Sequence, residues 1–177
     1  MKNFKLNEKD ILSNQDWTFP TTTYYGPGRF NEIAKFCEEF DIKNPLIVTD
    51  SGSKDLPFIK KLIALLSKNN IKSDLFYNIS PNPRDDEISK GCDQFKNGSH
   101  DSIIAIGGGS AMDGGKSICL TVNSETPLWD FEFEQPVPKI TKENAFPKII
   151  TVPTTAGTGA ETEITAMVTH LEKGMKF

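Results

Sequence analysis

The amino-acid sequence predicts an α/β fold of the Rossmann-like kind, in which a parallel sheet carries helices on both faces. Short apolar runs rich in Ile, Leu and Val alternate along the chain with longer segments whose apolar residues recur at helical spacing. Successive strands in such an alternation pair in parallel through right-handed crossovers. Three consecutive glycines directly follow one apolar run, at the carboxyl end of the predicted strand. Sheets of this kind bind their ligands at the carboxyl ends of their strands.

Length and charge narrow the possible functions. A chain of 177 residues can bury one good core, so we expect residues 1–177 to form one domain, with residues 1–16 as a candidate flexible segment. The formal net charge of -4 argues against a nucleic-acid binder. The polar first residues contain neither a signal peptide nor a membrane span, and we therefore expect a cytoplasmic protein without membrane partners.

The cysteines suggest no redox or metal chemistry. Cys37, Cys92 and Cys119 lie far apart, each within a predicted helix. An odd, unclustered set is neither a disulfide framework nor a zinc site. We expect packing thiols in a reducing compartment.

The chain begins with an extended segment and a helix. Residues 17–25 are aromatic and β-branched, which predicts an extended segment that Pro20 confines to an edge or to the start of a strand. A Gly-Pro-Gly turn stops it. Residues 29–40 are then predicted to form a helix, because apolar side chains recur there on one stripe. The stripe consists of Phe30, Ile33, Ala34, Cys37 and Phe40.

A buried strand over residues 45–49 delivers Asp50 to its carboxyl end, where an open α/β sheet gathers its ligands. Asp50 can accept hydrogen bonds from an adenosine ribose there. Its charge would repel a 2′-phosphate, which favours NAD over NADP. Alternatively, Asp50 is a plain helix N-cap or a turn residue. A helix over residues 54–69 follows, with an apolar stripe of Leu56, Ile59, Leu62, Ile63 and Leu66.

The third strand, over residues 72–77, leads into Ser-Pro-Asn-Pro at residues 80–83. Two prolines make this backbone rigid and hold the Asn82 amide in one orientation. Alternatively, the segment is only a loop that leads into the next helix, predicted over residues 84–97.

The segment of residues 102–116 organises the rest of the chain. An Ile-rich strand ends at Gly107, Gly108 and Gly109, and a helix is predicted to begin at Ser110. Unpaired N–H groups and the positive end of the helix dipole converge in such a turn, so it favours an anion, with a nucleotide diphosphate as the obvious candidate. Ser110 and Asp113 also fit a capping box, which needs no ligand. Three glycines, however, cost more backbone entropy than a simple turn requires.

Two better-known phosphate motifs do not fit this turn. The fingerprint G-x-G-x-x-G begins at Gly107 and Gly109 but fails at Met112. The P-loop pattern nearly matches Gly115-Lys116-Ser117, but its first glycine would fall on Ser110. Neither motif is therefore assigned.

Residues 123–146 contain several prolines and acids and predict an irregular excursion, to which we assign no chemistry. Its aromatic residues, Trp129, Phe131 and Phe133, are expected to pin the loop to the domain.

The next strand, over residues 146–153, ends at Thr154, Thr155 and Thr158 beside two glycines. Hydroxyls in this position can donate to ribose and phosphate oxygens. Alternatively, Thr158 caps a helix that contains Glu161. A strand around residues 166–169, a polar turn and the start of another strand complete the chain.

Two of these segments resemble the signatures of the iron-containing (group III) alcohol dehydrogenase family. The first is Gly-Gly-Gly-Ser-x-x-Asp-x-x-Lys at residues 107–116, and the second is Pro-Thr-Thr-Ala-Gly-Thr-Gly-Ala-Glu at residues 153–161. The resemblance covers residues 17–177, which correspond to the N-terminal half of a family member. It implies an oxidoreductase that transfers a hydride between an alcohol or aldehyde and NAD(P), and an N-terminal NAD(P)-binding domain for this chain.

The resemblance also implies a set of cofactor contacts. Asp50 matches a family Asp, Asn82 matches the Asn of a family Pro-Asn-Pro, and Lys176 aligns with a Lys that reaches the nicotinamide side. A Lys near a chain end is alternatively just solvated. Glu163 departs from the Thr often found at its position, so no contact is assigned to it. The complete expected cofactor-binding set is Asp50, Asn82, Gly107, Gly108, Gly109, Ser110, Asp113, Thr154, Thr155, Thr158 and Lys176.

The metal chemistry implied by the resemblance lies outside this chain. The family's divalent iron or zinc is bound by an Asp and three His of a C-terminal all-helical domain, which would begin after residue 177. His100 and His170 are too few and too separated for a metal set, so we assign no catalytic and no metal residues. We expect a shortened chain that does not turn over alcohol by itself and binds NAD(H) weakly or not at all. Exposed apolar surface should favour a homo-oligomer.

Two alternatives to an alcohol dehydrogenase stay open at this point. One is a relative on the same scaffold, a glycerol dehydrogenase or a dehydroquinate synthase, which residues beyond this sequence would distinguish. The other is a nucleotide-binding module without catalysis.

Overall fold

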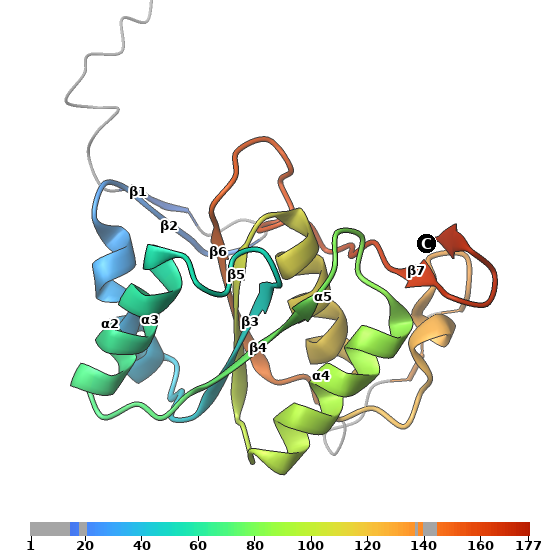
Figure 1. Ribbon diagram of the computed structural model, residues 1–177, viewed down its shortest axis with the longest axis horizontal. Coiled ribbons are helices and arrows are strands. Elements are labelled where there is room, and N and C mark those ends of the chain that lie inside the picture. Colours follow the sequence, from blue (N-terminus) through green and yellow to red (C-terminus); the bar gives the residue numbers. More distant parts are fainter. Residues whose placement is uncertain (1–14, 18–20, 137, 140–144) are drawn as a thin grey trace, which may run out of the picture.

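A four-stranded parallel sheet forms the centre of the computed structural model, which describes residues 15–17, 21–136, 138–139 and 145–177 (Figure 1). The strand order is β4-β3-β5-β6. Residues 1–14 of the candidate flexible segment lie outside the described residues, and Gln15 and Asp16 belong to a short strand. The four strands are β3 (Pro45–Asp50), β4 (Asp74–Ile79), β5 (Ser102–Gly107) and β6 (Lys148–Pro153).

All four strands run in the same direction, so their carboxyl ends meet at one edge of the sheet. Pro45 of β3 pairs with Ser102 of β5, and Ser102 pairs with Lys148 of β6. The two central strands, β3 and β5, are buried almost throughout because helices cover both faces. This register places Asp50 and Gly107 at the same edge.

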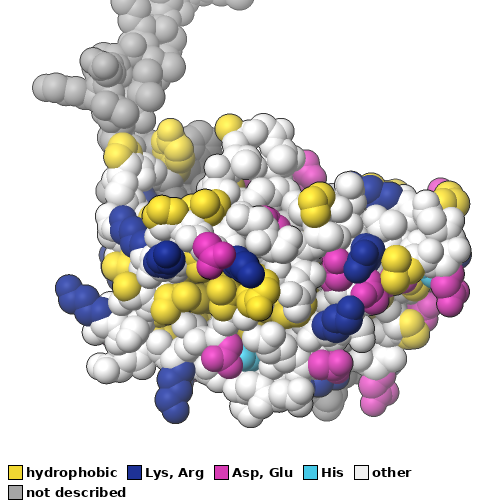
Figure 2. Space-filling model, in the orientation of Figure 1, with side chains coloured by type: hydrophobic (Ala, Val, Ile, Leu, Met, Phe, Trp, Pro, Cys, Tyr) yellow, Lys and Arg dark blue, Asp and Glu magenta, His cyan; other side chains and the backbone are white. Residues whose placement is uncertain are grey.

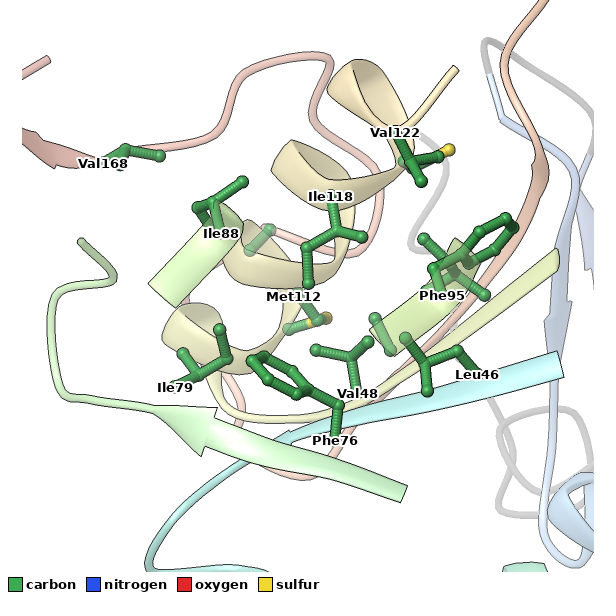
Figure 3. Close-up of a cluster of buried hydrophobic side chains, with 14 residues drawn as sticks. Leu46, Val48, Phe76, Ile79, Ile88, Phe95, Met112, Ile118, Val122 and Val168 are labelled. Carbon is green, nitrogen blue, oxygen red and sulfur yellow. The ribbon is translucent and has the colours of Figure 1, made fainter. Parts of the chain in front are cut away.

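Helices cover the two faces in pairs, as the sequence predicts (Figure 1). α2 (Ile33–Glu39) and α3 (Pro57–Lys68) pack on one face, where the core includes Ile47, Leu62 and Ile104. α4 (Asp85–Asn97) and α5 (Gly109–Thr121) pack on the other. Figure 3 shows this second core, in which Leu46, Val48 and Phe76 of the strands face Met112 and Ile118 of α5 and Ile88 and Phe95 of α4.

Glycines let α5 lie very close to the sheet. A Cβ added to Gly115 would lie 2.5 Å from the Cβ of Ala105 in β5, and one added to Gly91 of α4 would lie 2.3 Å from Cδ1 of Ile118. Neither distance is possible for real side chains. The close contact between β5 and α5 therefore requires Gly115, whereas a side chain at Gly91 would require Ile118 to move.

The N-terminal extended segment differs from the prediction. It forms a hairpin in which β1 (Gln15–Trp17) pairs antiparallel with β2 (Thr23–Tyr25), and residues 18–20, including Pro20, lie outside the described part. The predicted helix over 29–40 begins with a 3-10 turn, η1 (Arg29–Glu32). β4 starts at Asp74 rather than at residue 72.

The C-terminal part contains η2 (Leu128–Phe131) and a small hairpin, β7 (Thr169–His170) with β8 (Met175–Lys176). Trp129 packs against the core on the α4–α5 face, as predicted for the aromatics of this excursion, whereas Phe133 is 92% exposed.

Apolar side chains also reach the surface over α3 and β4, where Figure 2 shows them among lysines and acids. Leu56, Ile63 and Tyr77 are the large ones in this region. None of the helices in the described ranges is both long and apolar enough to cross a membrane.

Candidate nucleotide-binding site

The glycines of the turn between β5 and α5 let neighbouring groups lie very close to its backbone. Gly107 has a φ of 147°, and a Cβ there would lie 2.7 Å from the Cβ of Ala111 and 3.2 Å from Oδ2 of Asp50. Gly108 is the helix N-cap and α5 begins at Gly109, one residue before the predicted start. Because a glycine cap has no side chain, it leaves the first N–H groups of α5 available to an anion.

The capping-box alternative for Ser110 and Asp113 is wrong. Ser110 already lies in the first turn of α5, and its Oγ accepts a hydrogen bond from the Asn82 N–H at 3.3 Å. Asp113 instead pairs with Lys116 one turn further on, at 3.3 Å. Neither side chain caps the helix, and Ser110 connects two segments of the candidate site.

The segment of residues 154–158 lies beside the glycine turn. The Thr154 N–H donates to the Gly107 carbonyl at 2.8 Å. A Cβ on Gly108 would lie 3.4 Å from Oγ1 of Thr155, and a Cβ on Gly109 would lie 3.4 Å from Cγ2 of Thr158. All three threonines are exposed, so their hydroxyls can reach a ligand on the turn.

The alternative role of Thr158 as a helix cap is also wrong, because residues around Glu161 form turns rather than a helix. The Thr158 hydroxyl accepts a hydrogen bond from the Ala160 N–H at 3.4 Å within such a turn.

Asp50 lies at the carboxyl end of β3, partly buried and beside Gly107. Its Oδ2 accepts a hydrogen bond from the Ser53 hydroxyl at 2.7 Å, and its carbonyl accepts one from the Ser53 N–H at 3.1 Å. Asp50 is therefore a turn residue, as one alternative holds. It is not the N-cap of α3, because that position is occupied by Leu56.

Asn82 and Lys176 meet although they are far apart in the sequence. The Lys176 ammonium donates to Oδ1 of Asn82 at 2.8 Å, and Lys176 is also exposed to solvent. Asn82 has a left-handed φ of 61°, and the Pro-Asn-Pro loop also leads into α4. Both roles considered for this loop are therefore compatible.

Glu87 holds the Asn82 loop in place, a role that the sequence patterns above do not assign to it. Its buried carboxylate accepts hydrogen bonds from the N–H groups of Ser80 and Arg84 at 3.2 and 3.1 Å. It also accepts one from the Ser80 hydroxyl at 3.0 Å and pairs with the Arg84 guanidinium at 3.2 Å. Glu87 is the third residue of α4, a position at which Glu commonly accepts a hydrogen bond from the N-cap N–H, and this position could have predicted its role.

Lys116 is a second residue that supports the candidate site and to which the sequence patterns assign no role. Its ammonium donates to the carbonyls of Glu163 and Thr165 as well as pairing with Asp113. α5 thereby holds the segment that follows the exposed threonines. Asp113 and Lys116 lie three residues apart on one helix face, and this spacing predicts their ion pair. It does not predict the carbonyl groups that Lys116 also contacts.

The described residues offer no metal centre. No group of three or more His, Cys, Asp or Glu side chains in that part of the chain is arranged to hold a metal ion. His100 lies before β5 at the amino edge of the sheet, with Nδ1 3.0 Å from the carbonyl of Asn44. His170 lies on β7, in contact with Trp129.

Cys37 and Cys119 are buried, Cys92 is half-buried, and all three are free thiols. Burial raises the pKa of Cys119 to about 12, and burial together with the charge of Asp101 raises the pKa of Cys37 to about 11. Burial also raises the pKa of Cys92. Because the thiolate is the reactive form, none of the three is suited to nucleophilic catalysis.

Alkylation with iodoacetamide at pH 8 should therefore spare the folded protein. We expect Cys37 and Cys119 to react about a hundredfold more slowly than in urea, since they are buried and carry little thiolate. Mass spectrometry of the peptides measures each rate. Reaction of either thiol at its rate in urea would show that its helix opens readily.

Known proteins similar to this chain include two dehydrogenases. Choline dehydrogenase of Bacillus subtilis is 31% identical over 174 residues, which cover 97% of this chain and 43% of the relative. 1,3-Propanediol dehydrogenase of Klebsiella pneumoniae is 29% identical over 164 residues, which cover 92% of this chain and 41% of the relative. The chain thus spans about two fifths of the length of these relatives.

Solved structures show the same fold. The crystal structure of 1,3-propanediol oxidoreductase matches with a TM-score of 0.78 at 30% identity, over 86% of this chain and 38% of the other. Sulfoacetaldehyde reductase of Bifidobacterium kashiwanohense, solved in complex with NAD+, matches with a TM-score of 0.74 at 28% identity, over 85% and 39%. The family model described as iron-containing alcohol dehydrogenase matches residues 20–177, and the chain therefore belongs to that family.

Proposed function

We propose that this chain is the cofactor-binding part of a metal-dependent alcohol dehydrogenase and that it binds NAD(H) at the carboxyl edge of its sheet. One observation carries the proposal. The Asn82 loop and the threonine segment both contact the glycine turn at the start of α5, which has no side-chain cap, and Lys176 contacts Asn82. Four segments far apart in sequence thus bring hydroxyls, N–H groups and one ammonium to the same edge of the sheet. This combination suits a nucleotide diphosphate flanked by ribose.

Each side chain has a role in this proposal. The N–H groups at Gly109 and Ser110 and the threonine hydroxyls bind phosphate and ribose oxygens, and Lys176 contributes positive charge. Asp50 accepts hydrogen bonds from the adenosine ribose and repels the 2′-phosphate of NADP. Gly107 and Gly108 keep the backbone accessible, because any side chain there would occupy the space beside Asp50 or Thr155.

Bound NAD supplies the hydride acceptor for alcohol oxidation. The substrate class we propose is a small alcohol or aldehyde, and the native assembly a homo-oligomer. The described residues do not fit the family's metal, so no step of the reaction is assigned to them.

Fluorescence titration of this chain with NADH and NADPH tests the proposal. We expect saturable, weak binding of NADH and about tenfold weaker binding of NADPH, because Asp50 places a negative charge where the 2′-phosphate would lie. The variant Asp50→Gly should lose the preference.

Asp55→Gly is the matched control, since it removes an exposed acid from the same loop, and it should keep the preference. Absence of saturable binding of either nucleotide would overturn the proposal for this chain. A preference that survives Asp50→Gly would overturn the role of Asp50 alone.

A further inference from the structure

We propose that Trp129 is a positioning residue of the candidate nucleotide site: by packing against the β7–β8 hairpin, Trp129 holds Lys176 against Asn82. The inference rests on the proposed function, in which Lys176 contacts the cofactor. It gives a role to the irregular excursion of residues 123–136, to which the sequence patterns assign no chemistry.

An aromatic cluster of Trp129, His170 and Phe177 connects the excursion to the hairpin. The rings of Trp129 and His170 stack at 4.5 Å with an interplanar angle of 6°. Phe177 meets the edge of Trp129 at 5.7 Å and lies 6.4 Å from His170. His170 belongs to β7, and Phe177 directly follows Lys176, so both ends of the hairpin contact one indole ring.

Asp85, the first residue of α4, fixes the indole and the hairpin together. Its Oδ2 accepts hydrogen bonds from Nε1 of Trp129 at 3.3 Å and from the Leu171 N–H at 3.4 Å. Nδ1 of His170 lies 3.5 Å from the same oxygen. Asp85 is two residues beyond Pro83, so the cluster is anchored to the loop that carries Asn82.

Short backbone connections carry this anchoring to Lys176. Lys176 lies opposite Thr169 in the hairpin, and the Thr169 N–H donates to the Pro83 carbonyl at 2.7 Å. Phe177 and Val168 exchange two backbone hydrogen bonds, at 2.7 and 2.9 Å, and Val168 is buried. A displacement of the hairpin would therefore move the Lys176 ammonium away from Asn82.

The hairpin needs this support because its strands have only two residues each. Isolated two-stranded hairpins are marginally stable in water even when they are longer. Stacked aromatic pairs supply specific attraction beyond the apolar area that they bury. Trp129 therefore sets the position of the hairpin, while Lys176 makes the contact.

NADH titration of Trp129→Ala, Lys176→Met and the double variant tests the coupling. Lys176→Met should weaken NADH binding about tenfold, the effect of losing one charge-assisted contact. Trp129→Ala should weaken it by a similar factor, and the double variant no further than either one. Trp129→Phe, which retains the stack on His170 but loses the indole N–H, should keep most of the affinity. Losses that multiply in the double variant would overturn the proposal.

A second measurement needs no cofactor. Acetic anhydride labelling, followed by mass spectrometry, reports how reactive the Lys176 amine, which donates to Asn82, is relative to the amine of Lys60 on α3; both residues are exposed, so the ratio reports the hydrogen bond and not burial. Trp129→Ala should raise this ratio several-fold, and Trp129→Phe should leave it near that of the unaltered chain. An unchanged ratio in Trp129→Ala would overturn the proposal.

The two measurements separate this inference from the proposed function. If the ratio rises while the unaltered chain fails to bind NADH, Trp129 positions Lys176 and the proposed function is wrong. Urea unfolding of each variant identifies one that is globally unfolded, and in that case His170→Ala removes the same stack from the other side.

Discussion

Replacing Gly115 by alanine is expected to destabilise the protein by about 2 to 3 kcal/mol, the upper range for inserting one carbon into a packed core. The added Cβ would lie 2.5 Å from that of Ala105. Both atoms are bonded directly to backbone, so no rotation relieves the contact and α5 must move away from β5. The expected sign is the opposite of helix propensity, which favours alanine over glycine by about 1 kcal/mol. Urea unfolding measures the difference.

Two further variants identify the cause. Ala105→Gly in the Gly115→Ala background removes the opposing methyl and should recover much of the lost stability. Gly114→Ala should cost less than Gly115→Ala, because the atoms it would meet, Cδ1 at 2.7 Å and Cγ1 at 2.9 Å, belong to the side chain of buried Ile79, which can rotate, whereas the Cβ of Ala105 cannot. Equal or increased stability of Gly115→Ala would mean that α5 does not lie as close to β5 as described.

Replacing Glu87 by alanine should cost about 2 to 3 kcal/mol and also weaken NADH binding, because one buried carboxylate holds the Asn82 loop. The substitution leaves the N–H groups of Ser80 and Arg84 without their acceptor. The Arg84 side chain is 43% exposed and can turn to solvent, which keeps the cost below that of a fully buried pair. Urea unfolding and NADH titration give the two effects.

Asp86→Ala is the matched control for Glu87→Ala, both for stability and for NADH binding. Asp86 is the neighbouring acid and pairs with Arg84 and Lys90 on the surface. The hydrogen bond from Lys90 is the main cause that lowers the pKa of Asp86, and Arg84 adds to it. Exposed ion pairs of this kind nevertheless contribute only about 1 kcal/mol or less to stability. An equal loss for Glu87→Ala and Asp86→Ala would refute the special role of Glu87.

The sheet could be predicted from sequence because its signals are local. The short apolar runs at residues 45–49 and 103–106, each followed by turn residues, are typical of strands buried on both faces, and they lie in β3 and β5. The carboxyl-edge placement of Asp50 and Gly107 then follows from parallel pairing alone. Whether these residues bind NAD stays a prediction.

The two capping alternatives are wrong because the local sequence does not show the contacts that these side chains make instead. Ser110 has the sequence of an N-cap, but the glycine turn begins α5 one residue earlier, and the Ser110 hydroxyl accepts from Asn82 instead. Thr158 likewise precedes no helix. Contacts such as Lys176 with Asn82 or Trp129 with His170 join distant segments, and periodicity carries no information about such partners.

The strand order also sets the sequence of events in folding. Residues 51–73 connect β3 to β4, and residues 80–101, a connection of nearly the same length, connect β4 to β5, whereas β6 pairs with β5 only after the longer connection of residues 108–147. Closing each longer loop costs more chain entropy before its contacts form. We therefore expect β6 to dock last in refolding. The threonine segment directly follows β6, so the candidate nucleotide site would be completed only in the final step.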